Sequence, residues 1–240
     1  MVNLTGTIQE IPLVGFRTRL LSRRSVAEGT MAFHFAKPSG FSFKAGQAAD
    51  LTLLNPPETD SEGNIRTLSI ASPPFEDQLT FATRMRDTAF KRSLNVVPIG
   101  TEINIAPPSG SFTLHRNANK PAVFLAGGIG ITLFLSIVRQ ADHDRLAHKL
   151  YMFYSNPPPE DAPFLDILQG LEKTNPNFQL VATMTEMAHS GHEWKRETGF
   201  IDGQMLARHL GTLQGPIYYI CRTSTYGRGD ARDAGRCWRR

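Results

Sequence analysis

The 240-residue chain has little cysteine, no long apolar run and no signal-peptide pattern. Its two cysteines, Cys221 and Cys237, cannot build a disulfide framework or supply the thiolates of an iron–sulfur cluster. No apolar run approaches the roughly 18 residues that a transmembrane helix needs. The first residues lack the basic region and the apolar stretch of a signal peptide. We therefore expect a cytoplasmic protein without a membrane span.

An excess of positive charge is also missing from most of the chain. The formal net charge is +4, but residues 222–240 hold six arginines and two aspartates and so account for all of it. Residues 1–221 carry 20 basic and 20 acidic residues, which leaves no electrostatic footprint for nucleic acid or an anionic membrane. Because residues 222–240 are poor in aliphatic side chains, we expect them to form a basic, disordered tail. The seven histidines fall into no metal-binding pattern, so no metal site is expected.

Up to about Phe112 the pattern is typical of an antiparallel β domain. Apolar residues alternate with others in several short segments, and turns rich in proline and glycine separate the segments. Strands are predicted around residues 31–35, 51–53, 79–85 and 103–105. Such spacing favours a closed or nearly closed barrel, with one short helix over residues 89–96.

After a polar segment at residues 115–121 the pattern changes to alternating strands and helices. Strands are predicted at residues 122–126, 149–154, 179–183 and 217–221, and helices at residues 132–147, around 164–171 and at 204–210. This alternation predicts a doubly wound parallel sheet, whose ligands bind at the carboxyl ends of the strands. The expected domains are therefore residues 1–116 (barrel) and 117–221 (α/β), followed by the tail 222–240.

A glycine-rich turn connects the first strand of the α/β domain to its first helix. Gly127, Gly128 and Gly130 follow the apolar run at residues 123–126, and a helical pattern opens at once. Glycines here let backbone amides and the helix N-terminus approach a nucleotide phosphate closely. The alternative is a tight turn that needs small residues and binds nothing, and the spacing differs from G-x-G-x-x-G.

Four short motifs, in order across the two domains, resemble the ferredoxin–NADP reductase superfamily. They are Phe43-Lys44-Ala45-Gly46-Gln47, Arg66-Thr67-Leu68-Ser69, Gly127-Gly128-Ile129-Gly130-Ile131-Thr132 and Tyr218-Tyr219-Ile220-Cys221. The resemblance implies a Greek-key flavin-binding barrel followed by a nicotinamide-binding α/β domain. It also implies an FAD-dependent oxidoreductase that takes a hydride from NAD(P)H and passes electrons to a separate acceptor, either a protein or a small molecule.

The resemblance also implies roles for individual residues. Arg66 would pair with the flavin phosphate, and the Ser69 hydroxyl would bond flavin N5. Leu68 stands where the family has a tyrosine, so we expect a less shielded or less tightly bound flavin. Ser69 and Cys221 are the expected catalytic residues. The other cofactor-binding residues implied are Thr67, Thr83, Arg84, Met85, Lys91, Ser93, Gly127, Gly128, Gly130 and Thr132.

The identity of each nucleotide is less sharply defined by the sequence. A helix starting at Ala89 would aim its N-terminus at a pyrophosphate, which favours FAD over FMN. Ser155-Asn156-Pro157-Pro158-Pro159, after the second α/β strand, contains neither the acid expected for NAD nor the arginine expected for NADP. Since relatives tend to have a basic residue there, its absence favours NADH, but NADPH stays open. Thr185 and Trp194 match the next family segment only loosely.

The end of the chain departs from the family pattern. The family continues with Gly-Pro, a helix and a final strand, whereas Arg222 to Gly227 reads Arg-Thr-Ser-Thr-Tyr-Gly. Codons for these residues, read one base later, permit Gly-Pro-Pro-Pro-Met-Val. We therefore hypothesise a frameshift just after Cys221, which would remove the last helix and strand. A second function stays open beside the reductase: a non-catalytic flavin- or nucleotide-binding protein, or a decayed copy of the enzyme.

Overall fold

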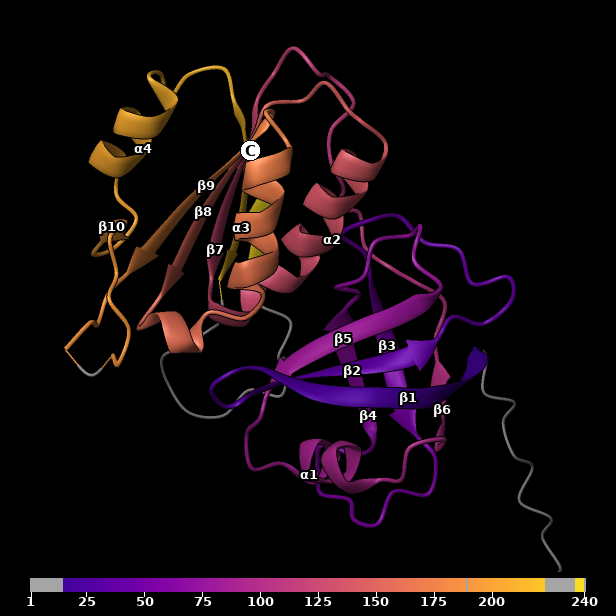
Figure 1. The fold of residues 1–240 in the computed structure, drawn as a ribbon. Coiled ribbons are helices and arrows are strands. Elements are labelled where there is room, and N and C mark those ends of the chain that lie inside the picture. Colours follow the sequence, from indigo (N-terminus) through magenta and orange to yellow (C-terminus); the bar gives the residue numbers. More distant parts are fainter. Residues whose placement is uncertain (1–14, 189, 223–235, 240) are drawn as a thin grey trace, which may run out of the picture.

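The computed structural model describes residues 15–188, 190–222 and 236–239. It contains two sheets, and one lies above the other in the view of Figure 1. The first sheet belongs to the N-terminal part of the chain. Its strands are β1 (Phe16–Ala27), β2 (Thr30–Ala36), β3 (Ala48–Leu53), β4 (Ile65–Ser69), β5 (Gln78–Arg84) and β6 (Glu102–Ile105), and helix α1 (Ala89–Val96) lies between β5 and β6.

This first sheet closes into a barrel. Its strand order is β4-β3-β6-β1-β2-β5, and every neighbouring pair is antiparallel. A further antiparallel bridge joins Ile70, just after β4, to Phe81 of β5, so the two edges of the sheet meet. Alternate residues of these strands fill the interior, as Phe33 and Phe35 do on β2. The expected antiparallel barrel and the helix at residues 89–96 are confirmed.

The second sheet is parallel, with one antiparallel strand at its edge. Its elements are β7 (Ala122–Gly127), the 3₁₀ turn η1 (Gly128–Gly130), α2 (Ile131–His143), β8 (Leu150–Asn156), η2 (Pro159–Asp161), α3 (Leu165–Thr174), β9 (Phe178–Met184), β10 (Glu197–Thr198), α4 (Gly203–Leu210), β11 (Ile217–Arg222) and β12 (Arg236–Arg239). The strand order is β10-β9-β8-β7-β11-β12, and the first five strands are parallel.

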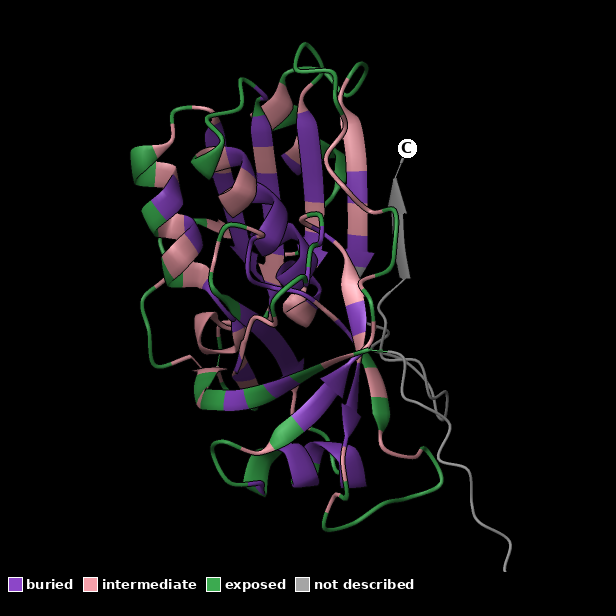
Figure 2. Cartoon of the chain, turned by 90° about the vertical axis from the view of Figure 1, so that its right-hand side faces the viewer, coloured by how far each residue is buried: buried purple, intermediate pink, exposed green. Residues whose placement is uncertain are grey.

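Helices cover both faces of this sheet. Residues of α2 and α3 pack with one face in the largest apolar cluster, and Met205 of α4 packs with Val123 and Phe153 on the other face. The strands are accordingly buried along most of their length, while outward helix surfaces are exposed (Figure 2). The predicted doubly wound sheet is confirmed. Among the described residues, no helix has both the length and the hydropathy to cross a bilayer.

The sequence missed four strands, β1, β4, β10 and β12, and misplaced the end of one helix. β1 is rich in arginine and largely exposed on one side, so it lacks a clear apolar alternation, and β10 has only two residues. Helix α2 ends at His143 rather than 147, because the chain turns at Arg145, whose φ is 52°. The expected disordered tail was wrong for residues 236–239, which pair with β11 and satisfy hydrogen-bonding groups at its edge. The rest of the tail, at 223–235 and 240, lies outside the described residues.

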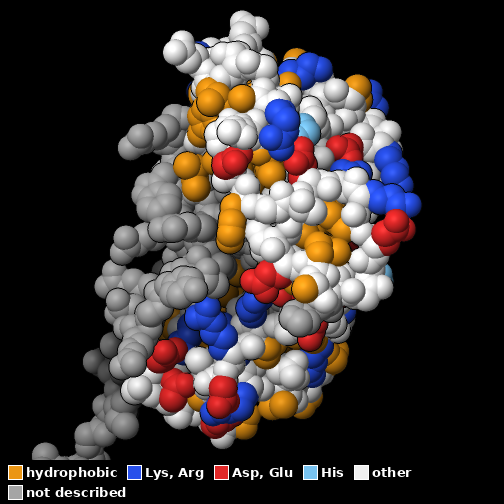
Figure 3. Space-filling model, turned by 90° about the vertical axis from the view of Figure 1, so that its left-hand side faces the viewer, with side chains coloured by type: hydrophobic (Ala, Val, Ile, Leu, Met, Phe, Trp, Pro, Cys, Tyr) orange, Lys and Arg blue, Asp and Glu red, His pale blue; other side chains and the backbone are white. Residues whose placement is uncertain are grey.

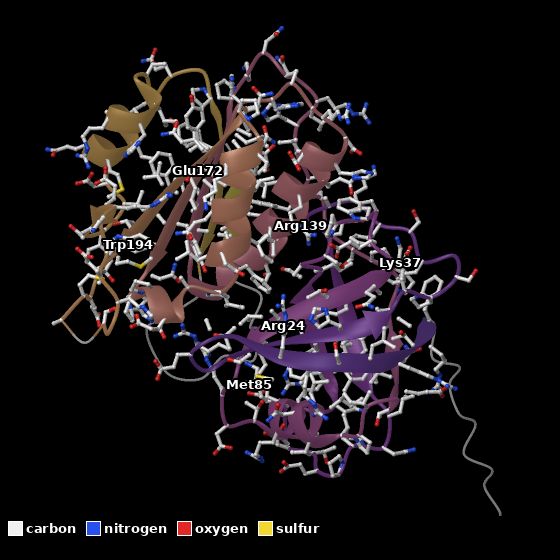
Figure 4. All side chains as sticks on the ribbon, viewed as in Figure 1. Arg24, Lys37, Met85, Arg139, Glu172 and Trp194 are labelled. Atoms are coloured by element: carbon white, nitrogen blue, oxygen red, sulfur yellow. The ribbon has the colours of Figure 1, made fainter. Side chains whose placement is uncertain are left out.

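Helix α2 joins the two domains. Its buried Ser136 hydroxyl donates a hydrogen bond to the carbonyl of Ser72 in the barrel, at 2.8 Å. Near the end of the helix, His143 stacks on Phe75 with ring centroids 4.0 Å apart. Arg139 of α2 and Arg24 of β1 lie at the junction of the domains and line one cavity (Figure 4). Arg139 is ion-paired with Glu76 there. The α/β sheet is thus held directly over the barrel.

Candidate functional site

A cavity with a volume of about 620 Å³ lies between the barrel and the α/β sheet. The carboxyl ends of four parallel strands open into it, through Gly127 of β7, Asn156 of β8, Thr185 just after β9, and Cys221 of β11. The barrel contributes the ends of β4 and β5. The complete lining is Gly46, Ala48, Thr67, Leu68, Ser69, Ala82, Thr83, Arg84, Arg86, Lys91, Ser109, Gly110, Phe112, Gly127, Gly128, Ile129, Gly130, Thr132, Leu133, Ser155, Asn156, Pro157, Thr185, Phe200 and Cys221.

The glycine turn forms one wall of this cavity, and its glycines are required for different reasons. Gly128 has a φ of 53°, in the left-handed region that favours glycine. A Cβ at Gly130 would lie 2.8 Å from the carbonyl oxygen of Cys221, so the turn can approach β11 only without a side chain. A Cβ at Gly127 would meet nothing within 4 Å, which leaves that backbone open. Thr132 stabilises the turn, because its hydroxyl donates a hydrogen bond to the carbonyl of Ile129 at 3.1 Å.

The opposite wall comes from the barrel. Leu68 is 7% exposed and Ser69 is half-buried at the end of β4, next to Thr67, whose hydroxyl donates to the Asp50 carboxylate. Buried Thr83 and partly exposed Arg84 end β5. The Lys91 side chain is buried although it belongs to α1. The structure therefore brings eleven of the predicted residues to one cavity: Thr67, Leu68, Ser69, Thr83, Arg84, Lys91, Gly127, Gly128, Gly130, Thr132 and Cys221.

Three predicted residues, Arg66, Met85 and Ser93, do not line the cavity. Met85 packs against the barrel core, and the buried Ser93 hydroxyl donates to the carbonyl of Glu58 at 3.3 Å. The Arg66 guanidinium bonds the Glu62 carboxylate at 2.5 Å and the Ile65 carbonyl at 2.7 Å. Its role toward a flavin phosphate therefore stays a prediction, because in this structure a carboxylate holds it.

Carboxylates of the β3–β4 loop also occupy the start of α1. Asp60 accepts hydrogen bonds from the backbone amides of Ala89 and Glu62, at 2.8 and 2.9 Å, and these bonds lower the pKa of the Asp60 carboxyl. Glu58 accepts two hydrogen bonds from Arg92, at 2.8 and 2.6 Å, and its pKa is lowered for that reason. Both groups are therefore charged at neutral pH, and Asp60 occupies the helix N-terminus to which the sequence assigned a pyrophosphate.

The environment of Cys221 differs from that of the catalytic thiol expected there. Cys221 is 3% exposed and lines the cavity, but it is disulfide-bonded. Cys237 lies opposite it in the register of β11 and β12. A sulfur in a disulfide has no thiol proton and does not titrate. The expected catalytic role of Cys221 thus has no thiol to act through in this structure.

Fourteen of the lining residues were not predicted as site residues, and Asn156, Thr185 and Phe200 are among them. Asn156 and Thr185 lie at the carboxyl ends of neighbouring strands, and the backbone amide of Thr185 donates to the carbonyl of Asn156 at 2.9 Å. Phe200 is 80% exposed, and it lines the cavity. Only the positions of Asn156 and Thr185 at predicted strand ends could have singled those two residues out. Trp194, by contrast, lies outside the lining and donates to the carbonyl of Glu197 at 2.8 Å (Figure 4).

The two walls of the cavity differ in charge. The charged lining residues, Arg84, Arg86 and Lys91, all come from the barrel, whereas every lining residue from the α/β domain is uncharged. On the face shown in Figure 3, basic and acidic side chains are intermixed rather than gathered into a surface of one sign. The positive wall therefore suits a ligand whose phosphates lie on the barrel side.

Comparisons with known proteins agree with this arrangement. Residues 124–224 match the family described as "Oxidoreductase NAD-binding domain". The chain is 27% identical to the propane 2-monooxygenase reductase component of Mycolicibacterium goodii over 88% of this chain and 61% of that protein. It is 25% identical to ferredoxin–NADP reductase B of Sorangium cellulosum over 86% of this chain and 85% of the relative.

The fold is also found in solved structures. A ferredoxin NADP⁺ reductase from Neisseria gonorrhoeae, with bound FAD and NADP, superposes with a TM-score of 0.70 at 20% identity, covering 91% of this chain and 95% of that one. The chain spans only 47–61% of the length of the propane 2-monooxygenase reductase components that it resembles. Those relatives therefore contain further segments with no counterpart in the matched part.

Proposed function

Because the chain belongs to the ferredoxin–NADP reductase superfamily, we propose that it is a flavin-dependent oxidoreductase. It oxidises NADH or NADPH and passes the electrons to a separate acceptor. The observation that carries this proposal is one cavity whose walls are the end of β4, with Leu68 and Ser69, and the glycine turn of the α/β domain. Ligand sites of α/β sheets lie at the carboxyl ends of their strands, and this cavity lies there.

The residues present fit a flavin in size and in chemistry. A volume of about 620 Å³ is within the usual range of ligand cavities. The wall contains an apolar side chain, Leu68, that can cover an aromatic ring, and Arg84 and Lys91 supply positive charge for phosphates. We propose FAD rather than FMN. When bound, the flavin supplies the redox chemistry by accepting two electrons from a dinucleotide and releasing them singly.

The protein's own contribution is positioning. Leu68, 7% exposed, forms a fixed apolar surface, and the neighbouring Ser69 offers a hydroxyl that can donate a hydrogen bond to a ring nitrogen. The open backbone at Gly127 and the close approach of Gly130 to β11 leave room for a dinucleotide on the other side. Two rings held in this way between rigid strand ends need little reorganisation to react.

The acceptor is proposed by analogy. The relatives named above include reductase components of propane 2-monooxygenases. The two cysteines of this chain cannot supply the four thiolates of an iron–sulfur cluster. We therefore propose a separate protein or a small molecule as acceptor, and neither nucleic acid nor a membrane as a partner.

The alternative is a flavin- or nucleotide-binding protein without reductase activity. The observation in its favour is that carboxylates hold Arg66 and the start of α1, and that Cys221 has no free thiol. Absorbance spectra of the purified chain, incubated with FAD or FMN and then given NADH or NADPH without oxygen, separate the two. We expect a yellow protein that is bleached by a dinucleotide. A yellow protein that neither dinucleotide bleaches would support the alternative, and a colourless one would overturn both flavin assignments.

A further inference from the structure

A cavity with a volume of about 440 Å³ lies at the junction of the two domains, where Arg24 of β1, His34 of β2 and Arg139 of α2 line it. This junction cavity shares no lining residue with the cavity to which the flavin and the dinucleotide are assigned. Its volume is within the usual range of sites for small molecules. The proposed reductase function makes no use of it, so its lining points to a separate ligand.

The α/β domain supplies an apolar surface to the junction cavity. Leu135 of α2 and Phe164, just before α3, are buried, and the half-buried Ile167 of α3 packs against the same apolar cluster. The β1–β2 hairpin reaches the segment before α3, because the backbone amide of Glu28 donates a hydrogen bond to the carbonyl of Glu160 at 2.9 Å. An apolar group that entered the cavity on this side would be removed from water.

The two arginines of the junction cavity differ in what they contact. Arg139 is ion-paired with Glu76, and these two charges neutralise each other. The Arg24 guanidinium, on the barrel side of the junction in Figure 4, has neither an ion pair nor a hydrogen bond among the described residues. Arginine binds carboxylates through two parallel hydrogen bonds, so an unpaired guanidinium in a cavity wall suits a carboxylate ligand.

The other unpaired charge of the lining, Asp77, lies at the far end of the cavity. Arg24 pairs with Ala32 in the register of β1 and β2, whereas Asp77 precedes Gln78, which pairs with Ala36 of β2. Four residues along a strand span about 13 Å. Because this exceeds the screening length of about 8 Å at physiological ionic strength, a carboxylate held by Arg24 is only weakly repelled by Asp77.

His34, two residues after Ala32 on β2, adds a polar group without a charge. Its Nδ1 and the hydroxyl of Thr80 form a hydrogen bond of 3.0 Å. Burial, followed by the positive charge of Arg24, lowers the pKa of His34 and outweighs the opposite effect of Glu76. The ring is therefore neutral at neutral pH. The lining thus offers one unpaired positive charge, which suits a ligand with a single negative charge.

We propose that the junction cavity binds a small monocarboxylate with an apolar body. The carboxylate pairs with the Arg24 guanidinium, and the apolar body lies against Leu135, Phe164 and Ile167. Since Arg24 belongs to the barrel and the three apolar residues belong to the α/β domain, the bound ligand contacts both domains. This site goes beyond the proposed reductase function and does not depend on a bound flavin.

The test is a calorimetric titration of the full chain with benzoate as the probe, compared with benzamide and with acetate. Benzamide has the ring without the charge, and acetate has the charge without the ring. We expect benzoate to bind at least about tenfold more tightly than either, because binding needs both the guanidinium and the apolar surface. A parent chain that does not bind benzoate, or that binds benzamide or acetate equally well, would overturn the proposal.

Substitutions on both sides of the junction locate the site. Arg24→Gln is expected to weaken benzoate binding about tenfold, and Ile167→Asn about fivefold. Arg17→Gln is the matched control, because Arg17 is also exposed on β1 and also has no ion pair among the described residues, but it lies outside the lining. It should bind benzoate like the parent. Unchanged binding in Arg24→Gln, or an equal loss in Arg17→Gln, would overturn the proposal.

Discussion

Asp60 accepts a hydrogen bond of 2.8 Å from the backbone amide of Ala89, the first residue of α1. Its carboxylate therefore lies where the unpaired amides and the positive end of the helix dipole attract an anion. In the same loop, Glu62 holds Arg66. The groups that would otherwise receive a flavin diphosphate are thus in contact with the chain's own carboxylates. A bound diphosphate would have to compete with them.

This competition predicts that Glu62→Gln strengthens FAD binding. The substitution frees Arg66 to pair with a phosphate, and the expected gain is about threefold in Kd, since exposed ion pairs are worth about 0.2–1 kcal/mol. Quenching of flavin fluorescence measures the affinity. Riboflavin, which has no phosphate, should bind the parent and the variant equally. Glu102→Gln is the matched control, because it breaks the Arg19–Glu102 pair outside the cavity. An equal gain for riboflavin would contradict this explanation.

Removal of the Ser69 hydroxyl should slow flavin reduction without releasing the flavin. Ser69 is half-buried at the end of β4 and lines the cavity. For Ser69→Ala we expect an unchanged flavin content and a reduction rate about tenfold lower, corresponding to one hydrogen bond of about 1.4 kcal/mol. Stopped-flow absorbance under anaerobic conditions gives the rate. Thr113→Ala, in a residue outside the cavity lining, should keep the parent rate.

Two substitutions in the glycine turn, one at a crowded glycine and one at an open glycine, test whether close packing requires glycine there. In Gly130→Ala the new Cβ would lie 2.8 Å from the carbonyl oxygen of Cys221, and a clash with backbone cannot be relieved by a side-chain rotation. We expect a loss of about 1–3 kcal/mol in the free energy of unfolding. In Gly127→Ala the Cβ meets nothing within 4 Å, and φ is an ordinary −122°. Its stability in urea should match the parent within about 0.5 kcal/mol. Equal losses in the two variants would contradict the packing argument.

Glu197 should make part of the stability depend on pH. It bonds His209 of α4 at 2.8 Å and also Arg208 at 2.9 Å, and these hydrogen bonds lower the pKa of its carboxyl below the ordinary 4.5. A carboxyl with a lowered folded-state pKa stabilises the fold above its unfolded pKa, and that contribution is lost as the pH falls through the folded pKa. The Tm difference between the parent and Glu197→Gln should therefore be largest near pH 7 and shrink toward pH 3. Glu193→Gln, at an exposed position, should show little difference at either pH.

The frameshift hypothesis is tested on the gene itself. The frameshift would affect residues 222–240, of which the structure describes Arg222 at the end of β11 and Arg236–Arg239 as β12. Re-sequencing the DNA around codon 222 is expected to reveal one base gained or lost, after which the frame encodes Gly-Pro. An intact frame with an arginine codon at 222 would leave a genuine divergence of the chain.

The sequence alone determined both sheets and the place of the cavity. Alternation of apolar residues in β2 and β5, and the apolar run of β7 followed by glycines, are local patterns that burial on one or both faces imposes. The helix at residues 89–96 and the turn at Gly127 to Thr132 were found in this way. Eleven of the predicted site residues line the cavity, because motifs at strand ends keep their positions whenever the strands form.

Tertiary structure decided what the site residues touch. Arg66 is next to the cavity-lining Thr67 in sequence, but its guanidinium is held by Glu62, a contact that depends on how the β3–β4 loop folds back. Asn156 appears in sequence as one polar residue before three prolines, and only the fold shows that it is buried beside Thr185 and lines the cavity. Arg236–Arg239 has no strand pattern, yet it pairs along the free edge of β11. Periodicity records which face of an element is buried, whereas contacts within loops and pairing along a sheet edge depend on how the chain folds outside the periodic segments.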